Sequence, residues 1–146
     1  MTNKEQIFSS LREIMTKIEK STQEYLLGFD MSSAFSFSDN EETRKKHLRT
    51  YNKFSATLKT HIESCEQNIA NLSTLMHQAD NDCNRELTEE IVKQFDNYTM
   101  FSQSVSRFIE NCEATFLDLE NKFHPLAIAD YARELLSAIQ NYKNNI

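Results

Sequence analysis

Apolar side chains recur every three or four residues along most of the 146-residue chain, which is the period of an amphipathic α-helix. The pattern predicts a first helix from Thr2 to about Leu27 and a last helix that begins at Pro125. Between them it predicts two helices of about 38 residues each, together spanning roughly residues 40–122. A Pro at the first position of the last helix fits, because no intrahelical partner for its missing N–H is needed there.

The two middle helices carry the most regular apolar stripes. Sustained spacings of three and four residues predict knobs-into-holes packing against partner helices. Further apolar residues flank these stripes and widen them, so that each helix can bury two neighbours, as in a bundle. The stripes are Leu48, Tyr51, Ser55, Leu58, Ile62, Cys65, Ile69, Leu72 and Met76, then Ile91, Phe95, Tyr98, Ser102, Val105, Ile109, Cys112, Phe116, Leu119 and Phe123, with Phe54, Leu75, Val92, Phe101, Phe108 and Leu117 on their flanks.

The segment QADNDCN, residues 78–84, is short and polar. It predicts that the two middle helices fold back as an antiparallel hairpin. A turn centred near the end of this segment places Cys65 level with Ser102, and Ser55 level with Cys112. Such small layers would either make room for an aromatic side chain from the first or last helix, or form a small cavity or a thiol pair.

Charge follows the same register. Residues 43–62 contain six Lys or Arg and no acid, whereas residues 108–120 contain four Asp or Glu and no base. The hairpin brings these segments side by side, and we expect flanking ion pairs between them that fix the pairing of the helices.

Short motifs predict where the helices begin and end. Thr2 with Glu5, and Ser38 with Glu41, have the spacing of a capping box, which marks a helix N-terminus. Gly28 stands where a helix favours a left-handed residue just beyond its end. We therefore expect the first helix to stop at the residue before Gly28.

Composition supports an all-α fold in a single domain that covers residues 1–146. One Gly and one Pro leave little material for the turns of a sheet protein. Apolar residues make up 39% of the chain and charged residues 26%, with no apolar run long enough for a membrane span. Three cysteines without CxxC spacing, and no apparent secretion signal, favour free thiols in a cytoplasmic protein.

No motif in the chain predicts catalysis, a metal or a cofactor. The run DNDCN resembles the start of an EF-hand loop, but Arg85 occupies the position that needs Gly. His61 and Cys65 are one helical turn apart, and two ligands are too few for a metal site. Gly28 is the only Gly, so no glycine-rich oxyanion loop is available to a nucleophile. We expect a protein that is not an enzyme.

The segment GFDMSSAFSFSDNEE, residues 28–42, places four large apolar residues among serines and acids. Two interpretations remain open. Phe29, Phe35 and Phe37 could fold over one end of the bundle as a cap, with Phe37 preceding the Ser38 helix start. Alternatively Phe29, Met31, Phe35 and Phe37 form a docking segment for a partner protein.

The sequence thus predicts an antiparallel helical bundle built on a long central hairpin with two shorter flanking helices. The preferred function is a non-enzymatic interaction module, such as an adaptor, small chaperone, immunity-type inhibitor or regulator, that binds a helical partner or a second copy. A net charge of −6, and a basic run expected to face acids, argue against nucleic acid. The alternative is a ligand-sensing four-helix bundle with a small core pocket.

Overall fold

The fold is all-α, as predicted. The computed structural model describes residues 3–31, 41–117 and 125–146, and no strand occurs among them. Four helices account for nearly all of these residues. They are α1 (Asn3–Met31), α2 (Glu41–Asn81), α3 (Arg85–Leu117) and α4 (Pro125–Asn144).

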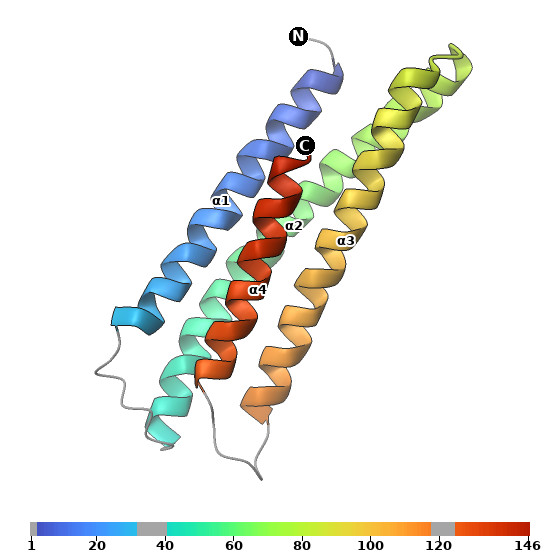
Figure 1. The fold of residues 1–146 in the computed structure, drawn as a ribbon. Coiled ribbons are helices and arrows are strands. Elements are labelled where there is room, and N and C mark those ends of the chain that lie inside the picture. Colours follow the sequence, from blue (N-terminus) through green and yellow to red (C-terminus); the bar gives the residue numbers. More distant parts are fainter. Residues whose placement is uncertain (1–2, 32–40, 118–124) are drawn as a thin grey trace.

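The helices run alternately up and down around one core (Figure 1). Contacts join α1 to α2, α2 to α3, α3 to α4, and α4 back to α1. The α2–α3 hairpin is therefore one side of a four-helix ring, and α1 and α4 form the opposite side. Each helix buries one stripe toward the centre, which is the packing of an up-and-down bundle.

The hairpin turns at the predicted place. The α2 helix ends at Asn81, and Cys83 takes a left-handed conformation with φ of 56°. Asn84 then starts α3, because its side-chain Oδ1 accepts a hydrogen bond of 3.2 Å from the Leu87 N–H. The α2 helix has 41 residues and the described part of α3 has 33, against about 38 predicted for each.

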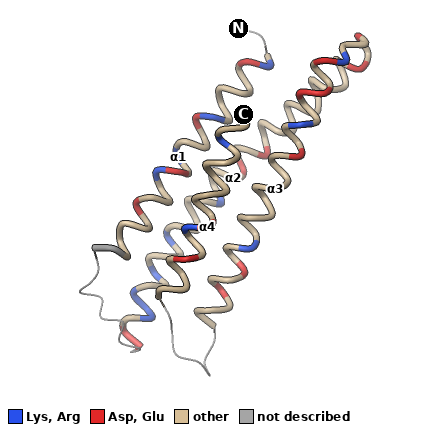
Figure 2. Tube along the Cα trace, viewed as in Figure 1, with Lys and Arg blue, Asp and Glu red and all other residues tan. Residues whose placement is uncertain are grey.

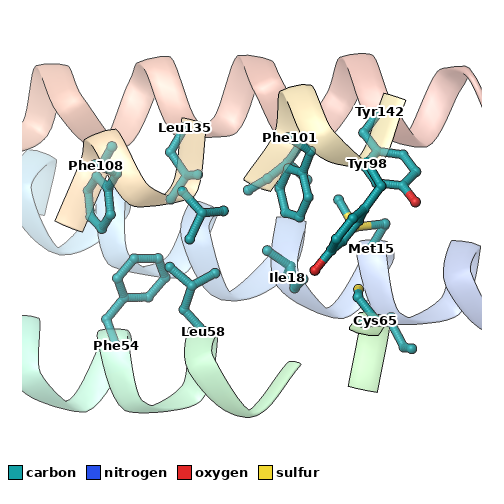
Figure 3. Packing of buried hydrophobic residues seen from close by; sticks show 14 of the residues in the cluster. Met15, Ile18, Phe54, Leu58, Cys65, Tyr98, Phe101, Phe108, Leu135 and Tyr142 are labelled. Atoms are coloured by element: carbon teal, nitrogen blue, oxygen red, sulfur yellow. The ribbon is translucent and has the colours of Figure 1, made fainter. Parts of the chain in front are cut away.

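The predicted stripes form most of the core, with three exceptions. Tyr51, Leu58, Cys65 and Leu72 on α2 are all buried. On α3 the buried members of the stripe are Ile91, Tyr98, Val105, Cys112 and Phe116, whereas Leu119 and Phe123 lie outside the described residues. Figure 3 shows Leu58 and Cys65 of α2 among core side chains of the other helices. The exceptions are Leu48, Val92 and Leu117, which were expected to pack between helices and are instead exposed.

The short helices cover the hairpin unequally. Lys4 near the start of α1 pairs with Glu90 on α3 at 2.9 Å, so α1 reaches almost to the hairpin turn. The chain ends lower on the hairpin, because the Gln94 side-chain Nε2 donates a hydrogen bond of 2.9 Å to the main-chain oxygen of Asn145. The hairpin tip beyond Gln94 is therefore not covered by α4.

The predicted end of the first helix is wrong. Gly28 lies inside α1, which continues to Met31, and Gly28 does not adopt a positive φ. Phe29 explains the extension, because its ring stacks on His47 of α2 at a centroid distance of 5.4 Å. A contact between helices thus outweighs the local preference of Gly for a helix end.

Gly28→Ala tests this correction. The position is exposed, and a Cβ there would meet no atom within 4 Å. Since Ala favours a helix interior over Gly, we expect the free energy of unfolding to rise by about 0.5–1 kcal/mol, measured by urea denaturation. A fall in stability would instead support the left-handed helix terminus.

Candidate functional site

The candidate site is the end of the bundle where α1 and α3 stop and α2 and α4 begin, called the loop end below. Of the four residues predicted to dock a partner, Phe29 has a described side chain. Met31 is the last residue of α1. Phe35 and Phe37 lie outside the described residues, so their role remains a prediction.

Phe29 packs on the bundle as part of an aromatic cluster. Its ring lies against His47 at 5.4 Å and meets Tyr25 edge to face at 5.2 Å. Tyr25 in turn stacks on Phe54 at 4.5 Å, deeper in the core. Phe29 is half-buried, so only part of its surface can meet another molecule.

Exposed leucines gather at the loop end. Six large apolar side chains in the described chain are exposed, and four of them are here: Leu27 (53%), Leu48 (36%), Leu117 (76%) and Leu126 (57%). Each comes from a different helix, since Leu27 is near the end of α1, Leu48 near the start of α2, Leu117 at the end of α3 and Leu126 at the start of α4. Exposed apolar groups can mark a surface that binds a partner, so the end of the bundle that holds four of the six is the candidate surface.

A basic face lies beside these leucines, on the first half of α2 (Figure 2). Arg49, Lys53 and Lys59 are exposed. The ion pairs expected between these three cations and Glu110 or Glu113 do not form in the described chain. The basic face is directed outward rather than toward the acids of α3, so these cations remain available to another molecule.

An internal repeat relates α2 to α3. Residues 51–66 read YNKFSATLKTHIESCE and residues 98–113 read YTMFSQSVSRFIENCE. The two segments share the pattern Y-x2-F-S-x6-I-E-x-C-E, with seven of sixteen positions identical. Because α2 and α3 are antiparallel, the repeat gives the core a local two-fold symmetry. The prediction from hydrophobic spacing missed it, although a comparison of the two segments by identity would have found it.

The repeat builds two equivalent thiol layers. In the first layer, Cys65 faces Tyr98 of the other repeat and Tyr142 of α4 (Figure 3). In the second, Cys112 is the neighbour of Tyr51 in the other repeat and of Tyr25 on α1. The predicted layers paired Cys65 with Ser102 and Ser55 with Cys112. Tyr98 lies one helical turn from Ser102, so those Ser–Cys pairs stay a prediction.

Burial determines the protonation of the thiols and hydroxyls in the two layers. Burial raises the pKa of Cys65 and of Cys112 to about 12, so both thiols are protonated at neutral pH and are poor nucleophiles. The pKa values of Tyr25, Tyr51, Tyr98 and Tyr142 are raised above the ordinary tyrosine value. Burial is the largest cause, and the neighbouring thiol is the second. In the described chain the hydroxyls of these tyrosines have no hydrogen-bond partner.

The described residues contain no group of three or more His, Cys, Asp or Glu side chains that could hold a metal ion. Nor is any described helix both long and apolar enough to cross a membrane. Comparison with protein-family models, with curated proteins and with solved structures finds no match to this chain. The features that bear on function are therefore the exposed leucines and the basic face at the loop end, and the thiol layers.

Removal of a layer hydroxyl provides a stability test. A buried hydroxyl without a partner costs about 1–3 kcal/mol, and Phe keeps the ring that fills the space. We therefore expect Tyr142→Phe and Tyr25→Phe each to raise the free energy of unfolding by that order. Tyr131→Phe is the control, because Tyr131 is half-buried. A loss of stability in the layer variants would show that their hydroxyls are hydrogen-bonded in solution.

His47 makes the stability of the loop end depend on pH. Burial, and then the charge of Lys46, lower the pKa of His47 below its ordinary value of 6.5. The folded state therefore binds a proton less readily than the unfolded state. Stability is complete above about pH 6.5 and declines as the pH falls from there to the lowered pKa. Each unit of lowering contributes at most about 1.4 kcal/mol.

Urea denaturation between pH 7.5 and pH 5 checks this expectation for His47. His47→Gln should reduce the acid-induced loss of stability, and the repeat itself places Gln94 at the corresponding position of α3. His61→Gln should reduce it too, since burial followed by Lys17 lowers the pKa of His61 as well. An unchanged pH profile in the variant that lacks both histidines would contradict the assignment.

Proposed function

We propose that this bundle is a non-enzymatic protein–protein interaction module that binds a helical segment of another protein at its loop end. The observation that carries the proposal is the set of four exposed leucines, one from each helix. An amphipathic helix laid across the end of a bundle would cover such side chains, as helices do in hydrophobic grooves. Adaptor, small chaperone, immunity-type inhibitor and regulator are the roles open to a module of this kind.

Two further features support a binding role over a catalytic one. The two buried thiols, Cys65 and Cys112, are protonated and are therefore poor nucleophiles. Phe29 and His47 fix the end of α1 against the start of α2, so the surface that carries Leu27 and Leu48 is held by packed aromatic rings. A surface held in place before binding loses less conformational entropy when it binds.

Affinity purification from the native cell, with mass spectrometry of the retained proteins, tests the proposal. The variant is Leu117→Ser with Leu126→Ser. The matched control is Val92→Ser with Met100→Ser, which changes the two exposed apolar residues that lie away from the loop end. We expect a protein that wild type and control retain and the loop-end variant loses. Equal retention by all three would contradict the proposal.

The thiol layers favour a second candidate function, ligand sensing. Four buried hydroxyls without partners are an unusual feature for a core, where polar groups are nearly always hydrogen-bonded. A small polar ligand that bonds to Tyr98 and Tyr142 would satisfy two of these four hydroxyls. Thermal shift with a library of small ligands tests this candidate. A stabilising ligand whose effect disappears in Tyr98→Phe with Tyr142→Phe would support sensing over protein binding.

A further inference from the structure

A small cavity lies between α3 and α4, toward the end of α4. Its volume is about 80 Å³. About 10–15 Å³ of cavity volume holds one water molecule, so there is room for a ligand of roughly four to six non-hydrogen atoms. The residues that line the cavity come from these two helices alone, and they are Asn97, Met100, Phe101 and Ser104 on α3, and Ala138, Asn141, Tyr142 and Asn145 on α4.

The lining of this cavity carries no charge, although 26% of the residues in the chain are charged. Its polar side chains are those of three Asn, one Ser and one Tyr. By contrast, the depression beside the hairpin tip is lined by Lys4, Glu86 and Glu90 among others. Transfer of an ion from water into a site without an opposite charge is strongly unfavourable. The cavity between α3 and α4 therefore suits an uncharged ligand.

Asn97 supplies a hydrogen-bond donor that lacks an acceptor. Its side-chain Nδ2 is buried and has no hydrogen-bond partner within the described residues. Tyr142, which also lines the cavity, is 2% exposed, and its hydroxyl is unpartnered in the same part of the chain. Buried polar groups are nearly always hydrogen-bonded, and one left unpaired is unfavourable. A ligand that brings an acceptor oxygen to Asn97 would satisfy this donor.

Two other lining residues already use their donors within the protein. The Asn145 side-chain Nδ2 donates a hydrogen bond of 2.7 Å to the main-chain oxygen of Asn141, and lies 3.5 Å from the Asn141 Oδ1. The Ser104 hydroxyl donates one of 3.2 Å to the main-chain oxygen of Met100. The oxygens of Ser104 and Asn141 can still accept, because each carries two lone pairs. The cavity therefore combines one unpaired donor with acceptors, all of them uncharged.

We propose that this cavity binds a small uncharged carboxamide. The carbonyl oxygen of the ligand accepts a hydrogen bond from Asn97, and its N–H groups donate to the oxygens of Ser104 and Asn141. A short apolar substituent of the ligand packs against Phe101, which is 2% exposed and lies at the inner side, and Met100, which is 61% exposed and lies at the rim. The proposal rests on the second candidate function, ligand sensing, and names a ligand class for it. It does not involve the four leucines of the loop end.

Titration of the intact chain with acetamide, followed by NMR of the side-chain amide groups, tests the proposal. We expect saturable shifts of the Asn97 side-chain resonances with a dissociation constant of about 1 mM or weaker, since so small a ligand makes few contacts. Acetone, which lacks the N–H donors, and acetate, which is charged, should each bind at least about tenfold more weakly. The absence of saturable shifts would overturn the proposal, and so would equal affinity for acetone or acetate.

Two variants locate the site by independent means. Asn97→Leu removes the donor, and Ala138→Leu fills the cavity from the α4 side. Each should weaken acetamide binding at least about tenfold, measured on the amide resonances of Asn141 and Asn145. Thr50→Leu is the matched control, because Thr50 is exposed and occupies the position of Asn97 in the repeat, and it should bind acetamide as the wild type does. Undiminished binding in either cavity variant would overturn the proposal, once circular dichroism has shown that the variant keeps its helix content.

Tyr98→Phe with Tyr142→Phe separates this proposal from the ligand-sensing candidate on which it rests. The double variant keeps both rings and the amide groups of the cavity, so acetamide should still bind. Loss of acetamide binding in this variant would overturn the role of Asn97 and assign the ligand to the tyrosine hydroxyls. The leucine variants leave the cavity intact, so failure of partner binding at the loop end and failure of carboxamide binding are separately visible.

Discussion

Phe54→Ala and Phe101→Ala should each lower the free energy of unfolding by about 3–5 kcal/mol, the cost of removing a buried Phe. The two residues occupy the same position in the repeat, and both are almost completely buried. Phe54 stacks on Tyr25 at 4.5 Å, and Phe101 meets Tyr142 edge to face at 5.3 Å. Each ring therefore joins the hairpin to one of the two shorter helices. Figure 3 shows the second of these contacts, between Phe101 and Tyr142.

Urea denaturation of the two variants measures both losses on one scale. Lys53→Ala and Met100→Ala are matched controls, because each alters the exposed residue that directly precedes the Phe. These should stay within about 0.5 kcal/mol of the wild type. If the repeat is a true structural repeat, the two Phe variants should lose similar amounts. A loss confined to one of them would show that the two halves of the core are not equivalent.

The fold could be predicted because helical period and turn composition are local properties. The spacing of Tyr51, Leu58 and Cys65 fixes one face of a helix, and the polar segment at residues 78–84 fixes where the chain reverses. Exposure at the helix ends could not be predicted in this way. The spacing of apolar residues shows which face of a helix is apolar. It does not show whether a neighbouring helix is long enough to cover that face, and Leu48 and Leu117 remain exposed.

The predictions about Gly28 and about the basic residues of α2 were wrong for a related reason. The end of α1 is decided by the contact between Phe29 and His47, which are eighteen residues apart in the sequence. The expected ion pairs with Glu110 and Glu113 required the basic residues to face α3. The position of the turn shows which residues of α2 and α3 lie at the same height along the bundle. It does not show the direction in which a side chain points, because each residue rotates that direction by about 100° around the helix axis. Arg49 and Lys53 are exposed and point away from α3.

For the thiol layers, the sequence analysis predicted the buried positions but missed which residues meet there. The two cysteines were predicted to be core residues, and both are buried. Hydrophobic period treats Tyr and Leu as equivalent, so it does not register that the same Tyr, Phe and Cys recur after 47 residues. The tyrosines of α1 and α4 that complete the layers come from separate parts of the chain, and only the folded bundle brings them together.

A measurement of stability can decide whether Phe35 and Phe37 cap the bundle or bind a partner. These residues lie outside the described residues. The double variant Phe35→Ala with Phe37→Ala distinguishes the two interpretations. If the rings cover the end of the core, their removal exposes it, and the free energy of unfolding should fall by about 2–4 kcal/mol. If they dock a partner, the melting temperature should barely change and partner capture should fail.

We expect the first outcome, a stability loss of about 2–4 kcal/mol. Phe29, the one member of the predicted docking set whose side chain is described, packs on His47 and Tyr25 of its own bundle. Apolar side chains in the same short segment have the same reason to bury themselves, since each large apolar group gains about 1.5–3 kcal/mol on leaving water. Ser36→Ala is the control, because it changes the intervening polar position and should leave stability within about 0.5 kcal/mol. Unchanged stability together with unchanged capture would contradict both roles, and the four leucines would then be the remaining basis for partner binding at the loop end.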